Sequence, residues 1–217
     1  MSIKQSLSSQ KGDTVVEVMI AFAVFAAILV SSMAIMNLGI GKSMRSLEIT
    51  QVRQQMDAQA EMIRFIHDEY VAAYEKNRPE PSKAPASYWL ELRAIGIAPD
   101  AIAAFSNFKN GCPVNTDNIS EPFFIGGDLG SGDLEIFKKS SIIMSPPSGA
   151  TLPPHSQVDY QNGQAYGMWV QSVPGSSESG GITTKYIDFH IRACWQSSGG
   201  TEPVTLGTIV RLYEPSI

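Results

Sequence analysis

The chain has 217 residues and a formal net charge of −5, with 21 acidic and 16 basic side chains. This length suits one globular domain with an additional element, or two small domains. The acidic balance argues against a general nucleic-acid-binding protein, whose surface is usually basic, so no nucleic-acid partner is predicted. Apolar residues concentrate between Val15 and Ile40, whereas Gly, Ser and Pro concentrate after Arg78. The two parts of the chain are therefore expected to occupy different solvents.

Residues 1–12 are polar and slightly basic, and the chain from Val18 to Met36 is apolar except for Ser31 and Ser32. About 20 apolar residues span a bilayer as a helix. Serine hydroxyls can bond back to the helix backbone, so they do not prevent insertion. A core helix of a globular protein would have a polar face, which this segment lacks. The sequence predicts a membrane-spanning helix over residues 13–41.

Glu17 is the residue that discriminates among a secretory signal peptide, a plain signal anchor and a processed anchor. A carboxylate so close to the apolar run costs about 2–3 kcal/mol to insert and needs a partner. Cleavage after Gly12 would give Asp13 a new α-amino group, cationic at neutral pH, four residues before Glu17. The amine of a neighbouring copy would then neutralise Glu17 as the helices stack. The alternative is that Glu17 extends to the lipid headgroups.

The run from Lys11 to Ala21, KGDTVVEVMIA, resembles the class III signal of type IV pilins and type II secretion pseudopilins. In that family a prepilin peptidase cleaves after the glycine, the new first residue is N-methylated, and a glutamate at the fifth mature position aids assembly. The resemblance assigns processing to Gly12 and Asp13 and assembly to Glu17. Asp13 departs from the family pattern, which usually has Phe or another hydrophobe there. The resemblance covers about 30 residues, and Glu followed by Val is similar to a subset of minor pilins and pseudopilins.

The same resemblance implies a set of partners and a location. The partners are other pilin subunits, the prepilin peptidase, the pilus assembly platform and membrane lipids. The chain would be a single-pass membrane protein with an extracytoplasmic C-terminal domain before assembly, and part of an extracellular pilus afterwards.

The helix is predicted to continue past the apolar run, from Thr14 to near Lys76, because no proline occurs before Pro79. Its second half, within residues 42–78, is predicted to be amphipathic. Gly39 and Gly41 mark either a hinge or a tolerated break. Apolar residues recur at helical spacing at Ile49, Val52, Met56, Ile63, Ile66, Tyr70 and Tyr74. The charged residues mostly lie elsewhere around the helix: Arg45, Glu48, Arg53, Asp57, Glu61, Arg64 and Asp68.

Residues 79–217 are predicted to form the connection and an extracytoplasmic β domain. Ser87 is expected to cap a short helix that runs to about Ile95 and stops at Gly96. A second short helix is expected over Asp100–Phe108. Strands are predicted at Gly167–Val173, Tyr186–Trp195 and Thr205–Tyr213, joined as an antiparallel meander by turns at Pro174–Gly181 and Ser197–Pro203. Weaker strand signals lie at Phe123–Ile125, Leu134–Phe137 and Ser141–Met144, and Ser145–Ser156 is expected to be an exposed loop.

The two cysteines, Cys112 and Cys194, are predicted to form a disulfide, because exported chains meet oxidising conditions. Two unpaired buried thiols are the alternative. The sequence contains no recognisable catalytic motif and predicts no cofactor and no metal. His67, His155 and His190 lack metal-ligand spacing. Acidic residues around a glycine-rich turn are expected to be solvated rather than to bind calcium: Asp128, Asp133 and Glu135. The tryptophans and the many tyrosines could form a sugar-binding or adhesive surface, but core packing is expected to explain most of them; the tryptophans are Trp89, Trp169 and Trp195.

The expected fold is α+β and pilin-like, with a long N-terminal helix packed on a C-terminal antiparallel sheet. The expected function is that of a structural subunit, of the minor-pilin kind, in a type IV pilus or related filament. The first alternative is a membrane-anchored adhesin or receptor that never polymerises. The second is an anchored enzyme whose catalytic residues the sequence does not reveal.

Overall fold

The computed structural model describes residues 13–74, 81–102, 111–128, 133–145, 153–197 and 202–215. The chain divides into two compact units, Met1–Met44 and Arg45–Ile217. The boundary falls within one helix, so each unit contains part of it. The architecture is α+β, as predicted, with a long N-terminal apolar helix and a C-terminal antiparallel sheet.

Helix α1 spans Asp13–Ala73 and has 61 residues. It begins one residue before the predicted start and ends three residues before the predicted end at Lys76. The helix passes without interruption through Gly39 and Gly41, where an added Cβ would meet nothing within 4 Å. Close packing against the described residues therefore does not require either glycine at its position.

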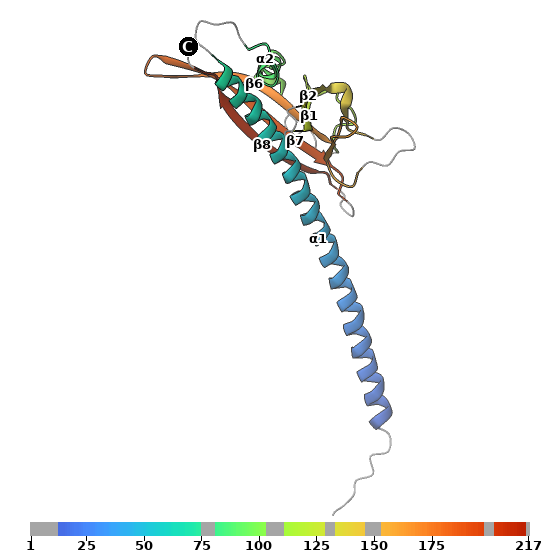
Figure 1. Cartoon of the computed structure of the whole chain (residues 1–217). Coiled ribbons are helices and arrows are strands. Elements are labelled where there is room, and N and C mark those ends of the chain that lie inside the picture. The colour runs from blue at the N-terminus through green and yellow to red at the C-terminus, as the bar shows by residue number, and fades with distance from the viewer. Residues whose placement is uncertain are drawn as a thin grey trace, which may run out of the picture. The chain divides into compact units, whose positions relative to one another are not determined.

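The main sheet has five strands in the order β2-β1-β6-β7-β8, and every neighbouring pair is antiparallel (Figure 1). A second, three-stranded sheet has the order β3-β5-β4. The three predicted strands near the C-terminus form the meander β6-β7-β8, so this prediction is confirmed. The bounds are β1 Phe123–Asp128, β2 Asp133–Lys138, β3 Ile142–Ile143, β4 Gln157–Asp159, β5 Gln164–Tyr166, β6 Met168–Ser179, β7 Ile182–Trp195 and β8 Val204–Tyr213.

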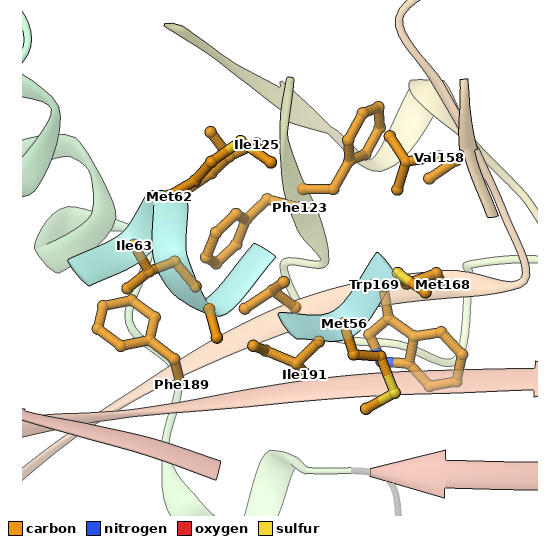
Figure 2. Packing of buried hydrophobic residues seen from close by; sticks show 14 of the residues in the cluster. Met56, Met62, Ile63, Phe123, Ile125, Val158, Met168, Trp169, Phe189 and Ile191 are labelled. Carbon is orange, nitrogen blue, oxygen red and sulfur yellow. The ribbon is translucent and has the colours of Figure 1, made fainter. Parts of the chain in front are cut away.

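The core of the second unit lies between the α1 residues after Arg45 and the main sheet. Alternation along β7 directs Ile187, Phe189 and Ile191 into this core. Figure 2 shows Met56 and Ile63 of α1 in the same cluster as Phe189 and Ile191. The predicted helical stripe is confirmed, since its residues are buried or half-buried: Ile49, Val52, Met56, Ile63, Ile66, Tyr70 and Tyr74. The predicted placement of the tryptophans is also confirmed: Trp89, Trp169 and Trp195 are buried.

Two predicted helices differ from the structure. Helix α2 spans Ala86–Ala94, and its N-cap is Pro85, with no side-chain capping bond. Ser87 is thus inside the helix, where its amide bonds to the carbonyl of Lys83 at 3.0 Å. Of the helix expected over Asp100–Phe108, the structure has only the 3-10 turn η1, Pro99–Ala101, and residues 103–110 lie outside the described part.

Two predicted loops also differ. Strand β6 continues to Ser179, so the predicted turn over Pro174–Gly181 reduces to Gly180 and Gly181, both with positive φ. Each of the predicted loops at 145–156 and 197–203 has an undescribed part, 146–152 and 198–201. Ser156, at the end of the first loop, is buried rather than exposed. Strands β4 and β5, which follow it, were not predicted. The 3-10 turn η3, Lys139–Ser141, precedes β3.

Candidate functional site

The first candidate site is the surface of α1 in the first unit. Every side chain described from Val15 to Met44 is exposed. Phe22, for example, is 72% exposed and Met33 is 71% exposed. Soluble monomers rarely expose contiguous apolar patches larger than a few hundred Å². Helix α1 is long and apolar enough to span a membrane. Contiguous exposed apolar surfaces larger than this usually mark a site of membrane or protein contact.

Glu17 is the only ionisable residue between Val15 and Gly41, and it lies on α1 with an exposed side chain. Within the described residues it has neither an ion pair nor a hydrogen-bond partner. Of the predicted processing residues, Gly12 lies outside the described part, and Asp13 is the first residue of α1.

Ser31 and Ser32 interrupt the apolar run. The Ser31 hydroxyl donates to the carbonyl of Ala27 at 2.7 Å, one helical turn earlier. This bond satisfies a polar group inside the helix itself, as expected for a serine in an apolar environment.

Glu48 anchors the beginning of the second unit. It is only 7% exposed, whereas the sequence grouped it with residues that mostly avoid the buried face. The Glu48 carboxylate accepts a bond from Trp195 Nε1 at 3.1 Å and a second from the Ser197 hydroxyl at 2.6 Å. It thereby joins α1 to the end of β7. Hydrogen bonds to a charged acceptor are stronger than neutral ones.

Gln59 makes a second polar connection, to β1, and is fully buried. Its Nε2 donates to the carbonyl of Ile125 at 2.7 Å, and its Oε1 accepts from the amide of the same residue at 2.8 Å. Strand β1 pairs with β6 only at Phe123 and Val170. The Gln59 side chain therefore bonds to the amide and carbonyl of Ile125, which lie beyond the point where β1 pairs with β6.

The predicted disulfide is present: Cys112 and Cys194 are bonded, with their Cα atoms 5.5 Å apart. It ties the chain before β1 to strand β7. A cavity of about 340 Å³ lies beside it, lined in part by Met144, Tyr166 and Trp195. Ser156 in the same lining directs its hydroxyl to the carbonyls of Gly167 at 2.9 Å and Cys194 at 3.2 Å.

The histidines do not come together. His67 on α1 contacts the carbonyl of Tyr213 through Nε2 at 2.9 Å and packs edge-on against Trp89. His190 lies on β7, and burial and the nearby Arg192 lower its pKa, while Asp188 opposes this shift. Within the described ranges, no three His, Cys, Asp or Glu residues are grouped to hold a metal ion. Asp128 and Asp133 are paired across the β1–β2 hairpin, and Glu135 is exposed.

Comparison with known proteins adds no relative. The chain matches no protein-family model, no curated protein and no solved structure.

Proposed function

We propose that this chain is a type IV pilin-like subunit, of the minor-pilin kind, that enters a pilus or related filament through its N-terminal helix. Two adjoining segments of α1 carry the proposal. The first is apolar, has every described side chain exposed and contains Glu17 as its one carboxylate. The second contributes one face to the core of an α+β unit. The first segment suits lipid before assembly and neighbouring helices afterwards. The second attaches a folded domain to it.

The chemistry of Glu17 supports polymerisation over simple anchoring. Cleavage after Gly12 would create an α-amino group at Asp13, and that amine in a neighbouring subunit would pair with the carboxylate. An isolated anchor has no such partner, so it would hold an ionised carboxylate near apolar lipid at a cost of about 2–3 kcal/mol.

N-terminal sequencing of the protein isolated from the cell envelope tests the processing step. We expect the mature chain to begin at Asp13, and Gly12→Val to retain the leader. A mature start at any other residue contradicts the proposal.

Polymerisation is tested separately by electron microscopy of filaments with this chain labelled. Glu17→Gln should remove the label from filaments, whereas the matched control Glu61→Gln, an exposed carboxylate further along α1, should retain it. If Glu17→Gln leaves filament labelling unchanged, the Glu17 contact does not drive assembly and the proposed role of this residue is wrong. If the wild-type chain is displayed at the surface but never labels filaments, it is instead a membrane-anchored adhesin or receptor that does not polymerise.

A further inference from the structure

A hollow of about 710 Å³ opens on the second unit, away from the disulfide. It lies where α2, the β1–β2 hairpin and the turn between β4 and β5 meet. Its volume falls within the about 300–1,000 Å³ typical of small-molecule sites. Six of its lining residues carry the argument: Tyr88, Glu135, Phe137, Tyr160, Gln161 and Asn162.

Three aromatic rings from three elements line this hollow, and two of them make contacts that fix their position. Phe137 stacks on Phe124 with ring centroids 5.0 Å apart. A Cβ on Gly126 would come within 2.6 Å of the Phe137 ring, and one on Gly163 within 2.5 Å, so both glycines leave the room that this ring occupies. The hydroxyl of Tyr160 lies 3.5 Å from Nε2 of the buried Gln59. Tyr88 of α2 is half-buried.

The polar side of the hollow is a turn fixed by Asp159. Its carboxylate accepts bonds from the amides of Gln161 and Asn162, each at 3.1 Å, and from Asn162 Nδ2 at 2.7 Å. Asn162 Nδ2 is bound to Asp159, so the side-chain oxygen of Asn162 is the atom that can accept a bond from a ligand. Gln161 and Glu135 are exposed at the same hollow and provide a second amide and a carboxylate.

This combination of groups selects one class of ligand. Aromatic faces pack on the apolar C–H faces of a pyranose ring, while amides and carboxylates accept or exchange bonds with its hydroxyl groups. The described lining contains no lysine or arginine, and the Glu135 carboxylate would repel a phosphate, sulfate or sialic acid. A purely apolar ligand would leave Glu135, Gln161 and Asn162 without the water that they now contact.

We infer that this hollow is a binding site for an uncharged carbohydrate. Tyr88, Phe137 and Tyr160 form the stacking walls, and Glu135, Gln161 and Asn162 bind the hydroxyl groups. The inference depends on the proposed function only in that the domain must face outward to meet such a ligand. Binding by the purified chain is independent of leader cleavage and of filament formation, so the two proposals fail separately.

The test uses the full chain in micelles of an amine-oxide detergent, which carries no sugar headgroup. The chain is applied to a printed array of neutral, sialylated and sulfated glycans. We expect retention on at least one neutral glycan. On that glycan, titrated in solution, Tyr88→Ala and Glu135→Gln should each weaken binding by at least about tenfold. Tyr88→Phe should restore most of the affinity, because it keeps the ring.

The matched controls change the same residue types elsewhere in the second unit: Tyr213→Ala and Glu178→Gln, both exposed. These variants should bind like the wild type. Retention on no glycan, or on acidic glycans only, overturns the inference. So does equal binding by Tyr88→Ala and the wild type. Thermal unfolding of each variant identifies any loss that comes from misfolding, and the Tyr88→Phe result then decides the role of the ring.

Discussion

Glu48 is a buried carboxylate that accepts hydrogen bonds from two donors, and neither donor has another described acceptor. Its Oε2 atom receives both Trp195 Nε1 and the Ser197 hydroxyl. The residue thus connects the first turns of α1 in the second unit to the end of the sheet. Charged residues are rarely buried unless they are paired in this way.

Removal of that carboxylate should destabilise the second unit. We expect Glu48→Ala to lower the free energy of unfolding by about 1–3 kcal/mol, because two donors lose their acceptor. Glu48→Gln should lower it less, since the amide oxygen still accepts. Urea unfolding followed by tryptophan fluorescence measures both. Asp57→Ala, an exposed position on the same helix, should change the value by less than about 0.5 kcal/mol, and an equal effect at both sites would contradict this account.

The environment of His190 predicts a dependence of stability on pH. Burial and the proximity of Arg192 lower its pKa below the usual 6.5, with Asp188 acting in the opposite direction. The unfolded chain therefore binds a proton at a higher pH than the folded chain does. Stability from this group is complete above pH 6.5 and is lost as the pH falls through the folded-state pKa. We expect His190→Gln to flatten the fall in unfolding temperature between about pH 7 and pH 5; an unchanged slope would show that His190 does not cause it.

At the scale of single elements, the backbone just before β6 lies very close to the backbone at the end of β7. Gly167 has a φ of +61°, and a Cβ there would collide with the carbonyl oxygen of Cys194. Gly180 in the β6–β7 turn has nearly the same φ, +60°, but an added Cβ meets nothing within 4 Å. The two glycines therefore differ in packing and agree in backbone conformation.

That difference gives a matched pair of substitutions. Gly180→Ala should destabilise by about 1–2 kcal/mol through its left-handed backbone alone. Gly167→Ala should lose a further 1–3 kcal/mol, about the usual range for overpacking. Unfolding midpoints in urea compare the two. Equal losses would mean that the contact with Cys194 is relieved by a small shift of the strand.

Elements with a long, one-sided pattern were predictable from the sequence. The α1 stripe repeats over seven positions, and alternation along β7 covers five buried residues. Strands β4 and β5 have three residues each, too few for a period of two to be distinguished from chance. The sequence predicts that strand β6 ends at Val173, because Pro, Gly and Ser usually indicate a turn, but the pairing of β6 with β7 continues to Ser179.

The polar contacts of the site had no local signal. Glu48 and Trp195 are 147 positions apart, and Gln59 and Ile125 are 66 apart. Each residue has ordinary helix chemistry in its own segment, so only the tertiary fold reveals that it is buried. Gly12, Asp13 and Glu17 were singled out because their signal is local, in one short run before an apolar stretch.

For the molecule as a whole, the disulfide is a covalent cross-link between two distant parts of the chain. Cys112 and Cys194 are separated by 82 positions. Closing a loop of this length lowers the entropy of the unfolded chain, which contributes about 4–5 kcal/mol in the chain-entropy model. The link holds the segment before β1 to the central meander.

Loss of the disulfide should therefore be felt throughout the second unit. We expect the double variant Cys112→Ser, Cys194→Ser to lose about 2–5 kcal/mol of unfolding free energy. Reduction of the wild-type protein should produce a similar loss and should have no effect on the double variant. A wild-type midpoint that is insensitive to reductant would show that the bond contributes nothing to stability.

The bond pair between Gln59 and Ile125 has a consequence for how α1 can be oriented. The residues on either side are Ala58 and Ala60, neither of which has a polar side-chain atom. Turning the helix about its axis by one residue, about 100°, would bring an alanine methyl group to the Ile125 backbone and leave a buried amide and carbonyl unmatched. Gln59 thus adds a polar restraint to the apolar face of α1: of the neighbouring rotational settings of the helix, only the observed one provides hydrogen-bond partners for the Ile125 amide and carbonyl.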